Sequence, residues 1–162
     1  MFLKRRFDGT PEQEYLFHSI RLEAAPGMRA ISESVLHDMA VLDSKSAALL
    51  TFISVVLAGL IFSLQLVESQ APYAHLIRGG IFVFMSLFAY AAWIDLRCLY
   101  TLGPSSFSPQ SNAADFERVS IAEIAKRRNK YQFALYISET SFLLLVPFAL
   151  IWMLVSARGM FF

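Results

Sequence analysis

The sequence predicts an all-α membrane protein with three transmembrane helices, cytoplasmic helical stalks and a short N-terminal helix. The first observation is composition: 56% of the 162 residues are hydrophobic and only 17% are charged, whereas soluble domains carry roughly 25% charged residues. A soluble domain of this length has too little interior to bury so much apolar surface. The other two observations are three uncharged apolar runs and a regular alternation of basic residues between the segments that connect them.

Residues 1–27 are expected to be a cytoplasmic segment with one short helix. Thr10 has the position of an N-cap, Pro11 follows at the first helical position, and Gln13 completes a capping box. The helix is expected to extend to about Ala24, because a Pro-Gly pair follows it.

Residues 28–67 are predicted to form one helix whose first half is a cytoplasmic stalk and whose second half is the first span. From Met28 apolar residues recur at three- and four-residue steps, and no Pro or Gly interrupts the chain before Gly59. As a helix, the uncharged run Ser46–Val67 covers about 33 Å, which is enough for a hydrocarbon core of about 30 Å.

The second span is predicted at residues 76–97. Its uncharged part lies between Arg78 and Asp95 and is short, but the long side chains of Arg78 and Arg97 reach the membrane surface from within the span. Residues 98–114 are rich in Ser, Pro, Asn and Gly, and they are expected to form a flexible cytoplasmic loop.

Residues 115–157 are predicted to form a second stalk helix that continues into the third span, and residues 158–162 are expected to be an external tail. Apolar residues recur among charged ones from Asp115 onward, so the helix is expected to reach the membrane without a break. Pro147 lies within this span, where it is expected to kink the helix.

Glu139 lies close to the inner end of the third span. The uncharged run from Thr140 is already long enough to cross the bilayer, and this favours a Glu139 at the membrane interface. A span that begins near Tyr131 would instead place Glu139 inside the bilayer, where a carboxylate needs a partner.

The Lys and Arg residues predict which side of the membrane each segment faces. Six precede the first span and six lie between the second and third spans, whereas the first connection and the C-terminal tail carry one each. Because basic residues accumulate on the cytoplasmic side, the N-terminus and the second connection are expected in the cytoplasm. The first connection and the C-terminus are then expected on the opposite side.

Several classes of function are not indicated by the sequence. A net charge of +1 gives no reason to expect nucleic-acid binding, which needs a basic patch. The single cysteine excludes an internal disulfide and a cysteine-cluster metal site. The three histidines are far apart in the predicted topology, and common catalytic motifs are absent from the sequence. We therefore expect no metal, no cofactor and no enzymatic activity.

The candidate functional residues are polar side chains that the topology brings to the inner membrane face. The favoured interpretation is that the basic residues are topology anchors and partners of lipid headgroups. The alternative is a polar collar between the helices, in which Asp43 pairs with Arg127 or Lys130. The basic cluster before the third span also suits an anionic nucleotide or anionic lipid. The collar or ligand-binding candidates are Asp43, Lys45, Arg127, Arg128, Lys130 and Tyr131.

Two segments resemble the membrane effectors of pyrimidine cyclase anti-phage (Pycsar) systems. Leu42–Leu50 is similar to their Asp-x-Lys-Ala-x-x-Leu-Leu approach to a membrane span, with Ser46 in place of the usual Ala, and Ile121–Tyr131 resembles their basic, Lys-Tyr-terminated approach to the final span. The resemblance implies a small inner-membrane protein that responds to a cyclic pyrimidine nucleotide made during infection and then impairs the membrane. It also implies roles for Asp43, Lys45, Lys130 and Tyr131.

The leading hypothesis is a non-enzymatic effector of antiviral defence that self-associates in the inner membrane. Its expected partners are membrane lipid, further copies of itself and a cyclic pyrimidine nucleotide. The alternative is a structural or assembly subunit of a larger membrane complex, because many small multi-span proteins without catalytic residues have that role.

Overall fold

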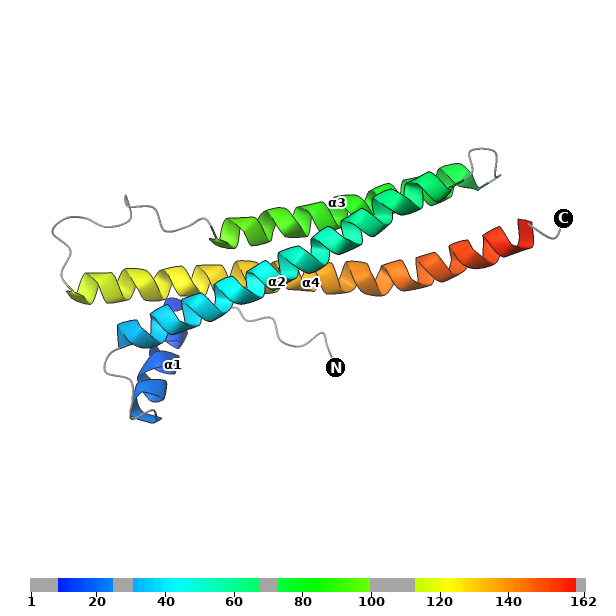
Figure 1. Ribbon diagram of the computed structural model, residues 1–162. Coiled ribbons are helices and arrows are strands. Elements are labelled where there is room, and N and C mark those ends of the chain that lie inside the picture. Colours follow the sequence, from blue (N-terminus) through cyan, green and yellow to red (C-terminus); the bar gives the residue numbers. More distant parts are fainter. Residues whose placement is uncertain (1–8, 25–30, 68–72, 100–112, 160–162) are drawn as a thin grey trace.

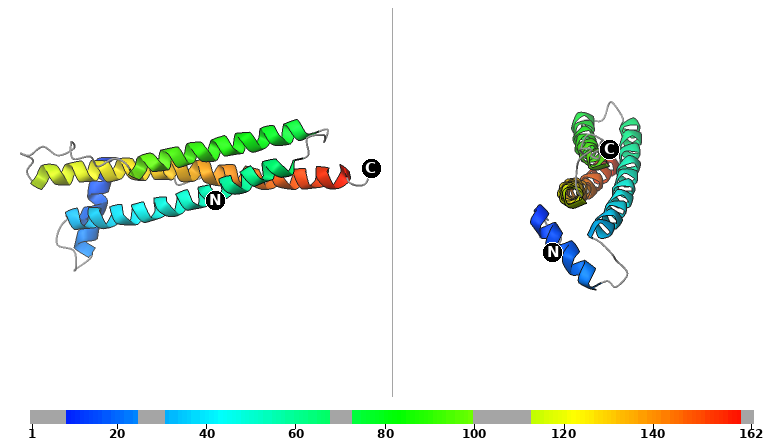
Figure 2. Two further views of the ribbon diagram at one scale, coloured as in Figure 1. Left: turned by 45° about the horizontal axis from the view of Figure 1, so that its top comes forward. Right: turned by 90° about the vertical axis from the view of Figure 1, so that its left-hand side faces the viewer.

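The computed structural model describes residues 9–24, 31–67, 73–99 and 113–159, and its regular structure there is entirely helical. The three longer helices lie side by side along one axis, and the shortest crosses them at one end (Figure 1; Figure 2). This confirms the predicted all-α fold class. The helices are α1 (Pro11–Ala24), α2 (Ile31–Leu66), α3 (Ala74–Leu99) and α4 (Ala113–Gly159).

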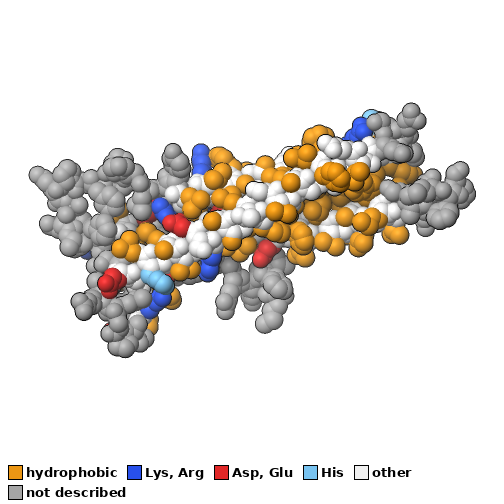
Figure 3. Space-filling view, in the orientation of Figure 1, with side chains coloured by type: hydrophobic (Ala, Val, Ile, Leu, Met, Phe, Trp, Pro, Cys, Tyr) orange, Lys and Arg blue, Asp and Glu red, His pale blue; other side chains and the backbone are white. Residues whose placement is uncertain are grey.

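Three helices are long and apolar enough to cross a membrane. The qualifying segments are Glu33–Leu66 of α2, Ala74–Leu99 of α3 and Arg118–Val155 of α4. Large hydrophobic side chains cover much of the outer surface of these helices, while charged side chains gather mainly toward the α1 end (Figure 3). An apolar surface of this extent is anomalous in water but suits contact with lipid. The chain thus has the architecture of a multi-pass membrane protein.

α1 begins with the capping box that the sequence predicts. The backbone N–H of Gln13 donates to Thr10 Oγ1 at 3.4 Å, and the backbone N–H of Thr10 donates to Gln13 Oε1 at 3.2 Å. Two N–H groups that the first turn would leave without a partner are satisfied in this way.

α2 and α4 are both much longer than a bilayer core. α2 has 36 residues and α4 has 47, which correspond to about 54 Å and about 70 Å of helix. Each is continuous, and α4 extends through Pro147 to Gly159. Each can therefore cross a membrane and still extend well beyond it toward α1.

The boundaries of the predicted connections differ slightly from those observed. Cys98 and Leu99, expected in the flexible loop, belong to α3. Cys98 is buried there, and its Sγ donates to the backbone oxygen of Arg127 at 3.2 Å. Residues 113–114 and 158–159, expected in the loop and the tail, belong to α4. The Pro-Gly stop after α1 and the rest of the predicted loop and tail lie outside the described residues.

A hydrophobic core runs between α2, α3 and α4. Phe88 of α3 is fully buried near the middle of this core. Partners from the other two helices include Ile53 of α2 and Ala134 of α4. α3 is antiparallel to both neighbours, so its C-terminal end lies beside the middle of α2 and α4 (Figure 1).

Candidate functional site

A network of polar side chains joins α1 to α2 and α4. At its centre is Arg128 of α4, whose Nη1 lies 3.0 Å from Glu14 Oε1 on α1 and whose Nη2 lies 3.2 Å from Asp38 Oδ2 on α2. One guanidinium thus contacts carboxylates from two other helices, an arrangement that the planar arginine fork suits. We call this the α1 network; its members are Glu14, His18, Arg21, Ser34, Asp38 and Arg128.

The remaining members of the α1 network connect α1 to α2. His18 Nδ1 and Ser34 Oγ are 2.8 Å apart, and Arg21 Nη1 donates to Asp38 Oδ1. His18 Nε2 lies 3.6 Å from Glu14 Oε2, one helical turn earlier. α1 is therefore attached to both long helices by charged and hydrogen-bonded groups.

The start of α1 also contacts α4 through its backbone. The N–H of Gly9 donates to Asn129 Oδ1, and Asn129 Nδ2 donates to the Gly9 oxygen, each at 3.3 Å. The Arg128 guanidinium lies 5.7 Å from the centre of the Phe17 ring, within reach of a cation–π interaction. Arg128 and Asn129 together hold α1 against α4.

Burial makes the charged forms of Glu14 and His18 costly. Both side chains are buried. Burial raises the pKa of Glu14, although the positive charge of Arg128 acts in the opposite direction. Burial lowers the pKa of His18, so its neutral form is favoured. Among the described residues no well-directed hydrogen bond reaches either Glu14 oxygen or His18 Nε2, so the nearby cation of Arg128 is the main compensation for the Glu14 charge.

A second group of ion pairs is centred on Arg127, the residue next to Arg128 on α4. Arg127 is buried, its Nη1 lies 3.4 Å from Asp43 Oδ1 on α2, and its Nε lies 3.7 Å from Glu123 on its own helix. The Asp43–Arg127 pair that the sequence predicts is therefore present. We call Asp43, Glu123 and Arg127 the collar.

The other predicted site residues lie apart from these ion pairs. Lys130 Nζ donates to the backbone oxygen of Arg97 at 3.5 Å rather than to Asp43. Lys45 is exposed on α2, and Tyr131 is partly buried against the hydrophobic core. Glu139 is exposed on the outer face of α4. The predicted set thus divides between the collar, the α1 network and the surface of the bundle.

Sequence reasoning missed most of the α1 network and one buried polar pair. A usable signal was present for the network: Glu14 with His18, and Ser34 with Asp38, are polar pairs four residues apart, so each pair shares one face of its helix. The buried pair is Ser46 on α2, whose Oγ donates to Asp95 Oδ1 on α3 at 2.9 Å. Spacing along the sequence contains no signal for that contact.

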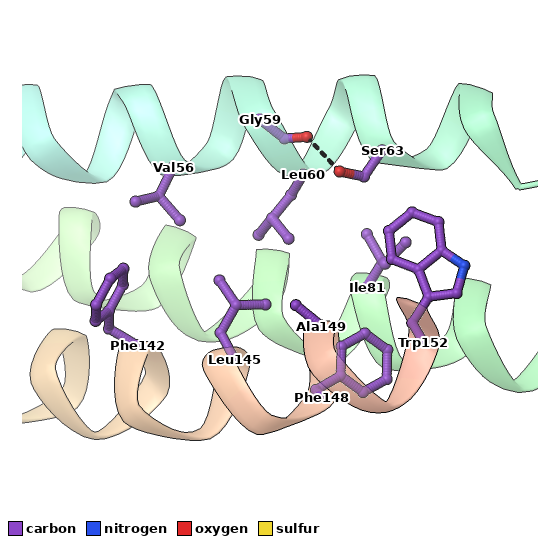
Figure 4. A pocket seen from close by; sticks show the side chains of 10 residues that line it. All are labelled: Val56, Gly59, Leu60, Ser63, Ile81, Phe142, Leu145, Phe148, Ala149 and Trp152. Atoms are coloured by element: carbon purple, nitrogen blue, oxygen red, sulfur yellow. Dashed lines mark hydrogen bonds between the residues drawn. The ribbon is translucent and has the colours of Figure 1, made fainter. Parts of the chain in front are cut away.

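An apolar cleft lies between α2 and α4 in the half of the bundle away from α1. Its volume is about 290 Å³, with Leu60 of α2, Phe148 and Trp152 of α4 and Ile81 of α3 among its lining side chains (Figure 4). The hydroxyl of Ser63 in its wall donates to the Gly59 oxygen of its own helix. The cleft can therefore accept apolar groups, and in the described part of the chain its lining contains no ionisable side chain.

The α1 network contains two guanidinium groups, and both bind carboxylate oxygens of neighbouring helices. Across the described ranges, no three His, Cys, Asp or Glu side chains are grouped as a metal ion would require. Arg21 and Arg128 are already held by carboxylates, and a phosphate presents the same kind of oxygen acceptors to a guanidinium. Comparisons with protein-family models, curated protein sequences and solved structures found no match for this chain.

Proposed function

We propose that this chain is a non-enzymatic effector of the bacterial inner membrane, of the kind found in pyrimidine cyclase anti-phage systems. In this proposal α1 and the connection between α3 and α4 lie in the cytoplasm, and the C-terminus lies outside. The support is the distribution of Lys and Arg, which concentrates on the segments before α2 and between α3 and α4, together with three helices of membrane-spanning length.

The observation that carries the proposal is the bridge formed by Arg128. Its guanidinium holds Glu14 of α1 and Asp38 of α2, and it belongs to the helix that continues into the third span. The phosphate of a cyclic nucleotide competes with the two carboxylates for this guanidinium. When the Arg128 guanidinium binds the phosphate instead, the buried Glu14 loses its compensating cation, and α1 separates from the bundle.

Separation of α1 changes the membrane-spanning part through α4. The segment around Arg128 is held by α1 and α2, whereas the distant half of α4 borders the apolar cleft. Loss of the Arg128 contacts removes one constraint on the tilt of α4, and the cleft leaves space for its distant half to move. The tilt of α4, in an assembly of several copies, is the step that perturbs the bilayer in this proposal.

Dye release from liposomes tests this function directly. The full chain is reconstituted into vesicles that contain a self-quenched dye, and 3′,5′-cyclic UMP or 3′,5′-cyclic CMP is added outside. We expect release with at least one of the two nucleotides and none with 5′-UMP. Arg128→Ala is expected to leak without nucleotide and to show no further response. Lys126→Ala, which removes an exposed cation two residues away, is expected to behave as wild type.

The outcomes separate clearly. Wild-type vesicles that stay sealed with both cyclic nucleotides would contradict the proposed function. Equal behaviour of Arg128→Ala and Lys126→Ala would contradict the role of the Arg128 bridge, even if the wild-type protein responds.

One observation favours the alternative of a subunit in a larger membrane complex. α1 exposes four large hydrophobic side chains, namely Tyr15, Leu16, Phe17 and Ile20. A cytoplasmic helix with so much exposed apolar surface is a candidate for contact with another protein. Native electrophoresis of mildly solubilised membranes distinguishes the two: a subunit migrates with a larger complex of other chains, whereas the effector migrates as copies of itself.

A further inference from the structure

The contacts between helices determine the level of Glu139 along the bundle axis, relative to the ends of the charge-free segments of α2 and α3. Ser46 of α2 bonds to Asp95 of α3, so the charge-free part of α2 and that of α3 begin at the same level. On α4, Lys130 reaches the backbone of Arg97. Glu139 comes nine residues after Lys130, about 14 Å further along the helix axis.

This register places Glu139 well inside the proposed membrane-spanning region. Asp95 lies about 3 Å beyond Arg97 along α3, so Glu139 lies about 10 Å beyond the level of Ser46 and Asp95. If the hydrocarbon core of about 30 Å begins at that level, the carboxylate lies about a third of the way across it. The register thus supports a third span that begins near Tyr131, the alternative to the interfacial position that the sequence favours.

The Glu139 side chain points away from the bundle. It is exposed, and so are Tyr136 and Leu143, which lie one turn before and after it on the same face. Within the described residues, no hydrogen bond or ion pair is observed for its carboxylate. In a single copy this group would face hydrocarbon, and a lipid tail has no donor to offer it.

We propose that the α4 face formed by Tyr136, Glu139 and Leu143 is the surface on which two copies of this chain associate within the bilayer. Two copies inserted in the same direction bring the same depth of α4 together about a twofold axis. Glu139 of each copy then lies within about one helical turn of Tyr136 in the other, and the phenol hydroxyl donates to the carboxyl group. Leu143 of both copies packs beside this pair.

A second copy fits this face better than lipid does for two reasons. The face is self-complementary, since it carries both a donor and an acceptor at neighbouring positions, and polar groups drive helix association where the surroundings supply no competing hydrogen bonds. The carboxylate is also too short to reach the headgroup region from this depth. This inference rests on the proposed membrane placement and adds to the proposed effector the surface by which its copies assemble.

Cysteine cross-linking tests the surface in the resting protein. Cys98→Ser gives a background without cysteine, because Cys98 is the only one in the sequence. Leu143→Cys then reports on the proposed face with Glu139 intact. Ala89→Cys is the control, since Ala89 is exposed on α3 and lies about 9 Å beyond Asp95, close to the depth of Glu139. Membranes that contain each variant are oxidised with copper phenanthroline, without any nucleotide.

We expect covalent dimers with Leu143→Cys and at least fivefold fewer with Ala89→Cys. Adding Glu139→Leu is expected to reduce the Leu143→Cys dimer at least fivefold, while Glu139→Gln, which still forms hydrogen bonds, retains most of it. Absence of the Leu143→Cys dimer, or its persistence with Glu139→Leu, would overturn the inference. Because no nucleotide or dye is involved, this result is independent of whether the proposed effector function holds.

Discussion

The two ends of the α2–α3–α4 bundle are held together by different interactions. At the α1 end, α2 and α4 are joined by directional ion pairs: Arg127 contacts Asp43, and Arg128 contacts Asp38. At the opposite end they are separated by the apolar cleft and share mainly rings and aliphatic groups (Figure 4). Ion pairs specify one alignment of the helices, whereas apolar contacts tolerate several.

This difference indicates which part of the molecule can rearrange. A change at the α1 end removes or adds a specific contact, and the opposite end has space in which the helices can shift. The same contrast suits a membrane protein in general, because hydrocarbon supplies no hydrophobic driving force between apolar helices. Tight packing there depends on close van der Waals fit and on interhelical hydrogen bonds. The predictions below test the contrast from the largest expected effect to the smallest.

The largest effect is expected from the centre of the apolar core. Phe88→Ala removes a fully buried ring and is expected to destabilise the fold by roughly 3–5 kcal/mol, the range for such cavities. Phe82→Ala is the matched control, because that ring is 57% exposed on the same helix. Unfolding by SDS in mixed micelles, followed by circular dichroism, measures both. Similar losses for the two variants would show that Phe82 is covered and that the assignment of the lipid-facing surface is wrong.

An intermediate effect is expected where α3 and α4 approach closely. A Cβ at Gly80 would lie 2.5 Å from Phe148 Cε2, whereas a Cβ at Gly79 has open space around it. Gly80→Ala must displace the Phe148 ring and is expected to cost about 1–2 kcal/mol. Gly79→Ala is expected to be neutral or stabilising by up to about 1 kcal/mol, because alanine favours a helix. The same unfolding assay applies, and the reverse order of the two variants would contradict the observed packing.

The smallest effect is a pH dependence at the α1 end. Burial lowers the pKa of His18, so its contribution to docking of α1 is present above about pH 6.5 and is lost as the pH falls through the lowered value. Glu14 acts oppositely: its raised pKa means that protonation favours the docked state as the pH falls. We expect hydrogen exchange in α1 to accelerate between pH 7.5 and pH 5.5, after correction for intrinsic rates.

Variants identify the group responsible for that pH dependence. His18→Asn is expected to remove the acceleration, and Glu14→Gln is expected to steepen it, because the opposing titration is lost. His37→Gln is the control, since His37 is exposed on α2. If His18→Asn keeps the wild-type profile, the titrating group lies elsewhere.

The sequence by itself determined the features that depend on one helix at a time. Apolar runs without charge predicted the three long helices, and Thr10 with Gln13 predicted the start of α1, because these patterns act through neighbours along the chain. It also indicated Arg127 or Lys130 as the partner of Asp43, since all three flank the predicted spans on the same side, and the structure has Arg127 in that position.

Only the tertiary structure decided which faces meet. The docking of α1 through Arg128, the Ser46–Asp95 bond and the outward position of Glu139 depend on how each helix is rotated and shifted relative to the next. A rotation of one residue, about 100°, or a shift of one turn, about 5.4 Å, exchanges these partners without changing any local pattern. Rotation and register are determined by the packing of side chains from all the helices at once, and that information is distributed over residues far apart in the chain.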